Sequence, residues 1–294
     1  MRNGILLLDK PAGLSSNAAL QKTRRMLQAD KAGHVGSLDP LATGMLPICL
    51  GEATKIAGDI LSGRKLYRFT VALGSRTATG DTEGAVVETA AVPPFDAALL
   101  NQVLSRFHGP QTQVPPMYSA LKRDGQPLYK LARAGIEVER AARNIEIFTL
   151  TLLTSSSAHL ELEALCSKGT YIRTLAEDIA KTLGTCGHVQ ALRRVYVEPF
   201  DIAPMETLES IARSVEAGTL PTILPPDAPL QHMAAVELDS RASEMIRHGQ
   251  PVVIGQCATA GRVRLYDAAK AFIGIGESDG AGNVRPKRLL NDAQ

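Results

Sequence analysis

One short segment of the chain, residues 33–44, places an acidic residue in a rigid backbone. Asp39 stands directly before Pro40, and His34 lies five residues upstream. Three glycines occur in the same segment, at Gly33, Gly36 and Gly44. Proline fixes its own φ and disfavours the helical region for the preceding residue, so we expect Asp39 on a non-helical loop. A carboxylate held this way is a candidate nucleophile or general base, whereas an isolated Asp-Pro pair predicts only a turn.

Local patterns predict the elements that hold this loop. A run of apolar residues predicts a buried strand over 4–8, and alternating apolar side chains predict strands over 66–73 and 159–166. Apolar spacing, capping residues and terminal glycines predict helices over 15–27, 52–61, 96–107 and 128–135. The predicted elements are a mixture of strands and helices, and the chain has no internal repeat at short period.

A second polar segment precedes another predicted helix. Tyr171 and Arg173 are two residues apart, which puts them on one face if this stretch is extended. Thr174 and Glu177 have the spacing of a capping box, which predicts a helix from Thr174 through Leu183.

Charge is unevenly distributed along the 294 residues, although the net charge is only +2. Residues 1–65 carry nine Lys or Arg against five Asp or Glu, and residues 120–143 carry six against three. Residues 201–240 carry one against seven. Separate basic and acidic segments favour a polarised surface that faces a polyanion, and ordinary solvated faces are the alternative.

The cysteines and the apolar segments indicate in which compartment the protein works and whether it binds metal or membrane. The four cysteines are Cys49, Cys166, Cys186 and Cys257. No pair has C-x-x-C spacing and no His/Cys cluster suggests zinc, so we expect buried thiols in a reducing compartment and no metal site. The N-terminal apolar run is too short for a signal peptide, and no apolar stretch has the length of a membrane span. We therefore expect a cytoplasmic protein without a membrane partner.

The end of the chain predicts a small separate unit. Prolines cluster between residues 221 and 229, which is typical of a linker. Beyond them, apolar alternation predicts three strands over 261–266, 272–277 and 284–290.

The segment Gly33–Lys55 resembles the catalytic motif of the tRNA pseudouridine-55 synthases of the stand-alone bacterial type, the TruB family. The family core G-x-L-D-P-x-A-x-G matches residues 36–44, with small replacements such as Val35 and Ser37 in and around it. Two further blocks, Val114–Lys122 and Lys168–Arg173, are also similar to the family. The resemblance extends over nearly the whole chain, from about Gly4 to Leu290.

The resemblance implies an α+β fold. Residues 1–228 would form a catalytic domain whose mixed, mainly antiparallel sheet is flanked by helices, with a basic RNA-gripping insertion at about 122–143. Residues 229–294 would form a small C-terminal RNA-binding β-barrel of the PUA type. A barrel that serves only packing is the alternative for this last unit.

The resemblance also implies a reaction. The enzyme would isomerise a T-loop uridine of tRNA to pseudouridine, acting as a monomer that requires no protein partner. No hydride, electron or phosphate moves in that reaction, so we expect no cofactor. The chain has no nucleotide-binding glycine loop and no metal-ligand cluster at the level of sequence.

Catalytic roles transfer onto three residues. Asp39 matches the catalytic aspartate, and its attack on C1′ of the ribose or on C6 of the base stays open. Tyr67 matches the tyrosine that stacks on the flipped base, although a strand tyrosine is more often a core residue. Arg173 matches the arginine that pairs with the aspartate and would keep it ionised and oriented.

Binding roles transfer onto four more residues. Tyr171 and Leu192 match residues that line the uracil pocket. His34 matches a histidine that contacts the RNA and assists base extrusion. Lys10 would support the pocket or bind phosphate, with a solvated lysine as the alternative.

Two other functions remain open at this point. One is a non-catalytic tRNA-binding or RNA-folding protein on the same scaffold, which would need none of Asp39, Tyr67 and Arg173. The other is a related catalytic subunit that depends on a guide RNA and partner proteins. The basic insertion at 122–143 argues against the second, because it resembles the enzyme's own grip on RNA.

Overall fold

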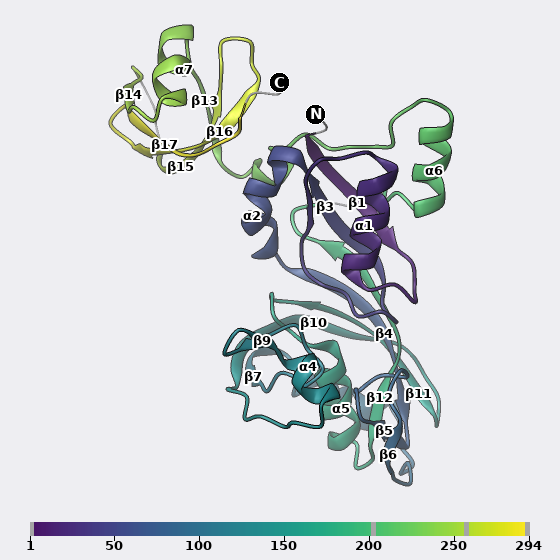
Figure 1. The fold of residues 1–294 in the computed structure, drawn as a ribbon. Coiled ribbons are helices and arrows are strands. Elements are labelled where there is room, and N and C mark those ends of the chain that lie inside the picture. Colours follow the sequence, from purple (N-terminus) through teal and green to yellow (C-terminus); the bar gives the residue numbers. More distant parts are fainter. Residues whose placement is uncertain (1–2, 201–203, 256–258, 292–294) are drawn as a thin grey trace.

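A mixed sheet of eight strands forms the centre of the computed structural model, which describes residues 3–200, 204–255 and 259–291 (Figure 1). The strands are β1 (Gly4–Lys10), β2 (Ala32–His34), β3 (Thr43–Leu50), β4 (Lys65–Leu73), β7 (Gly109–Gln113), β10 (Arg143–Ser155), β11 (His159–Cys166) and β12 (Gly187–Val197). They follow the order β1-β3-β12-β4-β11-β10-β7, with β2 beside β3. Only β3 and β12 pair in parallel, so the prediction of a mainly antiparallel sheet is confirmed.

Helices cover this sheet. They are α1 (Ser16–Met26), the 3₁₀ helix η1 (Gly51–Ile56), α2 (Ala57–Leu61), α3 (Ala97–Ser105), α4 (Leu128–Arg133), α5 (Ile172–Thr182) and α6 (Leu208–Glu216). Small two-stranded sheets join β5 (Ser75–Thr77) to β6 (Val86–Thr89) and β8 (Lys122–Arg123) to β9 (Gln126–Pro127). No helix in the described ranges is long and apolar enough to cross a membrane.

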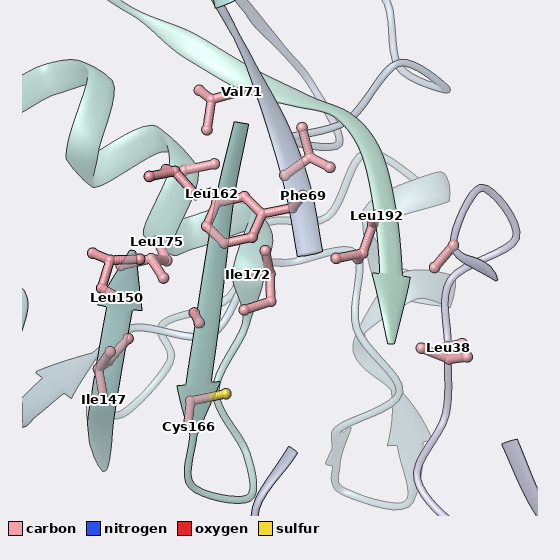
Figure 2. Close-up of a cluster of buried hydrophobic side chains, with 14 of the residues drawn as sticks. Leu38, Phe69, Val71, Ile147, Leu150, Leu162, Cys166, Ile172, Leu175 and Leu192 are labelled. Carbon is pink, nitrogen blue, oxygen red and sulfur yellow. The ribbon is translucent and has the colours of Figure 1, made fainter. Parts of the chain in front are cut away.

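The main hydrophobic core lies between the sheet and helices α1, α3, α5 and α6. Phe69 and Val71 of β4 meet Leu162 of β11 and Leu175 of α5 there (Figure 2). The apolar run of β1 is buried on both faces, because Leu6 and Leu8 enter this core while Ile5 and Leu7 face the other side. The strands predicted over 4–8, 66–73 and 159–166 are confirmed.

Two local predictions are wrong. The single helix expected over 52–61 is a 3₁₀ turn, η1, followed by the short helix α2. Helix α5 begins at Ile172 with Tyr171 as its N-cap, so Thr174 lies inside the first turn and forms no capping box. The buried amide of Gln113 determines this start, since it accepts from the Tyr171 N–H at 2.7 Å and donates to the Tyr171 carbonyl at 3.1 Å.

A second sheet follows the proline-rich segment and confirms the three strands predicted there. It comprises β13 (Ala234–Glu237), β14 (Val252–Val253), β15 (Ala260–Tyr266), β16 (Phe272–Asp279) and β17 (Asn283–Leu289), with helix α7 (Ser240–Arg247) and its own small core. The proline-rich segment itself contains the short 3₁₀ helix η2 (Ala228–Leu230). Leu224 exchanges two backbone hydrogen bonds of 2.8 Å with Ile5, so this segment covers the open edge of β1.

The C-terminal sheet docks on the elements that follow the Asp-Pro motif. The Lys55 ammonium donates to the carbonyl of Leu289 at 2.9 Å, and the backbone N–H of Asn291 donates to the Glu52 carboxylate at 2.7 Å. Ile275 of β16 completes a second apolar cluster. That cluster consists of Ile5, Leu7, Val35, Met45, Cys49, Ala53, Ile56, Ile60, Val197, Phe200, Leu230, Met233 and Ile275. A chain ended before residue 230 would therefore uncover apolar surface beneath the motif.

The cysteines that the structure describes are buried thiols, as the sequence predicts. Cys49, Cys166 and Cys186 are buried and unpaired, and burial raises the pKa of Cys49 to about 12 and that of Cys166 to about 11. Cys257 lies outside the described residues. Thiols with pKa values this high are poor nucleophiles at neutral pH.

Candidate active site

The carboxylate of Asp39 projects from a tight loop between β2 and β3. The Ala42 N–H donates to the Asp39 carbonyl at 3.0 Å, so the Asp-Pro pair does form a turn, as well as presenting the side chain. Buried Ser16 of α1 fixes the preceding residue, exchanging hydrogen bonds of 2.7 and 2.9 Å with the backbone of Leu38. With 37% of its side chain exposed, Asp39 remains open to a substrate.

Lys10 supports the far side of this loop. Its side chain is fully buried, and its ammonium donates to the carbonyls of Pro11, Leu14 and Pro40 at 2.8, 2.6 and 3.2 Å. Burial lowers the pKa of Lys10 to about 8, an effect partly opposed by Asp39 and then by Glu83. The solvated alternative for Lys10 is therefore wrong, and its donors hold the backbone next to Asp39 rather than a phosphate.

Arg173 is the hub of the site. Its Nε lies 2.9 Å from the Asp39 Oδ2, and its Nη1 lies 3.7 Å from the Oδ2 of Asp81. The same Nη1 donates to the Thr79 carbonyl and Nη2 donates to the Tyr118 carbonyl, both at 2.6 Å. Only 4% of the Arg173 side chain is exposed, so its planar fork can orient Asp39 in one direction.

The environment of Asp39 opposes ionisation on balance. Burial is the largest influence and raises its pKa from the ordinary value of 3.8, while the charge of Arg173 opposes that rise. The nearby Asp81 carboxylate raises the pKa further. A carboxylate that is held in place yet poorly stabilised as an anion is more reactive than one in water.

Asp81 is a site residue that the sequence did not reveal. It lies in the loop between β5 and β6, and its side chain is 3% exposed. Its Oδ1 accepts from the Thr79 hydroxyl at 2.5 Å and from the Glu83 N–H at 3.0 Å. An Asp that bonds a backbone N–H two residues later is the local signal of an Asx turn, and this signal could have marked the loop as rigid.

The predicted pocket residues Tyr67, Tyr171 and Leu192 come from three different elements. Tyr67 lies half-buried on β4, packed against the main core, and the charge of Asp39 contributes to raising its pKa after the larger effect of burial. Tyr171 precedes α5, so it does not share an extended strand with Arg173, yet both Arg173 and Asp39 lie near enough to influence its pKa. Leu192 of β12 is buried in the core between Phe69 and Leu38 (Figure 2).

His34 lies apart from these groups. It ends β2, opposite Ile48, and no hydrogen bond or ion pair joins it to Asp39 among the described residues. Its Nδ1 is buried without a hydrogen-bond partner. Burial, and then the charge of Arg194, lowers the pKa of His34, so its ring is neutral at physiological pH.

The site therefore combines an oriented carboxylate, a fixed arginine and two tyrosines. Within the described residues no cluster of three or more His, Cys, Asp or Glu side chains could hold a metal ion. The arrangement suits covalent or acid–base chemistry on a neutral, planar group that can lie against an aromatic ring.

Comparison with known proteins identifies the family. Residues 24–172 match the N-terminal domain of the TruB family pseudouridylate synthases. Residues 173–231 match the tRNA pseudouridylate synthase B C-terminal domain, and residues 234–290 match the C-terminal region of pseudouridine synthase II TruB. The chain belongs to the TruB family.

Curated relatives agree with this assignment. The chain is 48% identical to a tRNA pseudouridine synthase B from Aromatoleum aromaticum, over 98% of this chain and 93% of that protein. It is 50% identical to one from Nitrosococcus oceani, over 98% and 94% of the two chains. The motif-based family prediction is confirmed.

Solved structures confirm the TruB-type fold. An H/ACA RNP bound to a substrate RNA containing 2′-deoxyuridine matches 98% of this chain and 85% of its own, with a TM-score of 0.72 and 20% identity. A Cbf5-Nop10-Gar1 complex matches 99% and 84%, with a TM-score of 0.70 and 21% identity. The α+β sheet and a C-terminal sheet consistent with a PUA-like unit thus recur in chains that are only 20–21% identical to this one.

Proposed function

We propose that this protein is a tRNA pseudouridine synthase that converts the uridine at position 55, in the T loop, to pseudouridine. The names of relatives that align over nearly the full chain support the tRNA substrate and the isomerase activity. The observation that carries the catalytic assignment is the 2.9 Å ion pair between Asp39 and Arg173, because it aims a partly exposed carboxylate from a rigid loop.

In this reaction Asp39 forms a covalent bond to the nucleoside, at C1′ or at C6. The glycosidic bond between C1′ and N1 breaks, the uracil turns, C1′ bonds to C5, and the bond between Asp39 and the nucleoside breaks, which regenerates the carboxylate. The proton on C5 leaves and N1 gains one, so the product is an isomer and no redox equivalent is consumed. Arg173 holds Asp39 in line while bonds to it form and break.

The target base must leave the RNA stack to reach Asp39. Tyr67 gives the flipped uracil an aromatic face, and Tyr171 and Leu192 line its pocket. His34 contacts the RNA next to the flipped nucleotide as a neutral hydrogen-bonding ring. Lys10 acts indirectly, through the backbone at Pro40.

We further propose that the enzyme acts in the cytoplasm as a monomer, without a guide RNA or a protein partner. Residues 1–228 form the catalytic domain, and residues 229–294 form an RNA-binding domain that extends the contact along the tRNA. Support comes from the relatives at 48–50% identity, which carry the tRNA enzyme's name, against 20–21% for the chains solved in an H/ACA RNP with substrate RNA and in a Cbf5-Nop10-Gar1 complex.

A T-loop stem-loop tests the function directly. The purified protein alone should convert the target uridine to pseudouridine without change of mass, detected by chemical labelling and nuclease mapping. A stem-loop with cytidine at that position is the matched control. Binding without conversion would favour a non-catalytic RNA-folding protein, and conversion only with added guide RNA would favour the guided subunit.

Replacement of Tyr67 separates stacking from hydroxyl chemistry. Tyr67→Leu should lower the saturating single-turnover rate severely, since stacking on an aromatic ring is worth about 1–3 kcal/mol per base. Tyr67→Phe keeps the ring and should bind RNA like the wild type, but it should be slower if the hydroxyl assists removal of the C5 proton. Full activity in both variants would return Tyr67 to a purely structural role.

The basic segment 122–143 is suited to gripping the RNA backbone. Lys122, Arg123, Lys130 and Arg133 are all exposed. The segment is anchored by buried Leu128 and by Tyr118, whose carbonyl accepts from Arg173. The charged side chains of the segment therefore face solvent, while the residues just before it are bonded to Arg173.

Neutralising this segment should weaken binding and leave the chemistry intact. The variant Lys122→Gln, Arg123→Gln, Lys130→Gln, Arg133→Gln should lose about 0.7 from the log–log salt slope of tRNA affinity for each phosphate contact removed. Saturating RNA should recover most of the single-turnover rate. Four exposed cations elsewhere, Lys22, Arg106, Lys181 and Arg213, provide a charge-matched control. A lost saturating rate in a folded variant would place the segment in the chemical step.

A further inference from the structure

Arg194 is a buried arginine without an acidic partner among the described residues. Only 1% of it is exposed, in contrast to Arg193 beside it, which forms a two-pronged ion pair with Asp9 at the surface. Burying a guanidinium is costly unless its donors are satisfied. Two of the N–H donors of Arg194 bond backbone carbonyls, which offsets part of the cost of burying its charge.

Those backbone groups flank Asp39 on both sides. The Nη2 of Arg194 donates to the Gly36 carbonyl, and its Nε donates to the Met45 carbonyl, both at 2.8 Å. One planar side chain therefore fixes the beginning and the end of the loop that presents Asp39.

Two motif glycines make room for this contact. Gly36 has a φ of +70°, and a Cβ there would lie 3.2 Å from the Arg194 Nη1. Gly44 pairs with Arg194 across the parallel β3–β12 contact, has a φ of +99°, and a Cβ there would lie 2.2 Å from the Arg194 carbonyl oxygen. Larger residues would therefore push the loop away from Arg194.

Tyr67 lies beside Arg194 in the sheet. The two residues are direct partners in the antiparallel pairing of β4 and β12. Directly opposite residues of an antiparallel pair place their side chains on the same face of the sheet, so Arg194 and Tyr67 are neighbours there. One residue thus pairs with Tyr67 across the sheet and bonds the backbone on both sides of Asp39.

We propose that Arg194 is a positioning residue that locks Tyr67 and the Asp39 loop into one arrangement, so that the flipped base meets the ring and the carboxylate together. This inference rests on the proposed pseudouridine synthase function. Its role differs from that of Arg173, because Arg194 forms no ion pair with Asp39 in the described structure and acts through backbone carbonyls and its place beside Tyr67.

The charges around Tyr67 make the role measurable. Arg194 faces it from β12, Cys166 from β11, and Asp39 from the loop. Burial has the largest influence and raises the pKa of Tyr67, while the charge of Arg194 opposes the rise. Removing the guanidinium should therefore raise the Tyr67 pKa further and shift any alkaline limb of the rate profile to higher pH.

The test compares Arg194→Met and Arg194→Lys with Arg193→Met as the neighbouring control. We expect Arg194→Met to lower the saturating single-turnover rate on a T-loop stem-loop by up to about 100-fold, because misplaced reacting groups cost this much. Arg194→Lys should recover part of the rate, and Arg193→Met should retain it. RNA affinity should change by much less than the rate.

A double-mutant cycle of Arg194→Lys and Tyr67→Phe measures the coupling between Arg194 and the Tyr67 hydroxyl. If Arg194 acts through the hydroxyl, Arg194→Lys should cost less in the Tyr67→Phe background than in the wild type. Additive losses, or a lower melting temperature with an unchanged rate and pH profile, would reduce Arg194 to a structural role. A wild-type rate and pH profile in Tyr67→Phe would also overturn the proposal, without requiring any Arg194 variant to fold.

A readout independent of activity separates this inference from the proposed function. The ¹³Cζ signal of Tyr67 in labelled protein, assigned by its loss in Tyr67→Phe, should titrate at higher pH in Arg194→Met than in the wild type. An unchanged titration would overturn the positioning role even in an active enzyme. If the titration differs between Arg194→Met and the wild type in this way but the wild type converts no uridine, the proposed function alone would be refuted.

Discussion

Asp39→Asn should abolish conversion of uridine, with a single-turnover rate at saturating tRNA lowered by about three orders of magnitude or more. Asparagine keeps the shape of the side chain and can still meet Arg173, but a neutral amide cannot act as the nucleophile. RNA affinity should remain within a few-fold of the wild type, because the phosphate contacts that we propose lie in segment 122–143. Rapid-quench conversion and filter binding measure the two quantities, and a substantially active Asn variant would remove Asp39 from the mechanism.

Asp39→Asn should lower the rate without lowering the stability of the fold. Burial raises the pKa of Asp39 in the folded state, so the folded protein binds a proton at this carboxylate more tightly than the unfolded chain does. Its stabilising contribution is present below pH 3.8 and is lost as the pH rises through the folded pKa. Asparagine removes that loss, and Asp39→Asn should therefore melt no lower than the wild type at neutral pH. The wild-type rate should fall as acidification protonates Asp39.

Arg173→Met should damage both rate and stability. The substitution leaves Asp81, with 3% of its side chain exposed, as an uncompensated buried charge, which typically costs about 3–5 kcal/mol. It also releases Asp39 and the carbonyls of Thr79 and Tyr118. Denaturant unfolding should show the loss, and saturating single-turnover rates should fall by a factor comparable to that of Asp39→Asn.

Two controls define what Arg173 contributes. Arg193→Met breaks a half-exposed ion pair with Asp9 and should cost no more than about 1 kcal/mol. The double variant Arg173→Met, Asp81→Asn removes both buried charges and should recover much of the stability while the rate stays low. If the rate recovered together with stability, Arg173 would be a structural support rather than the residue that orients Asp39.

Local patterns in the sequence determined much of this protein. The apolar run of β1, the alternation of β4 and β11, and the rigid Asp39-Pro40 turn all depend on residues within a few positions of one another. The motif around Asp39 also carried enough ordered identities to indicate the family. Its glycines at positions 36 and 44 were visible as a pattern, although their reason, the close approach of Arg194, was not.

Only the tertiary structure decided how the site is assembled. Helix α5 begins at Ile172 instead of Thr174 because the distant amide of Gln113 bonds the backbone of Tyr171. Asp81 enters the site through Arg173, and Lys10 turns inward to three carbonyls. Periodicity and turn chemistry report on neighbours along the chain, whereas burial and ion pairing join strands that are distant in sequence, so these contacts exist only once the sheet has formed.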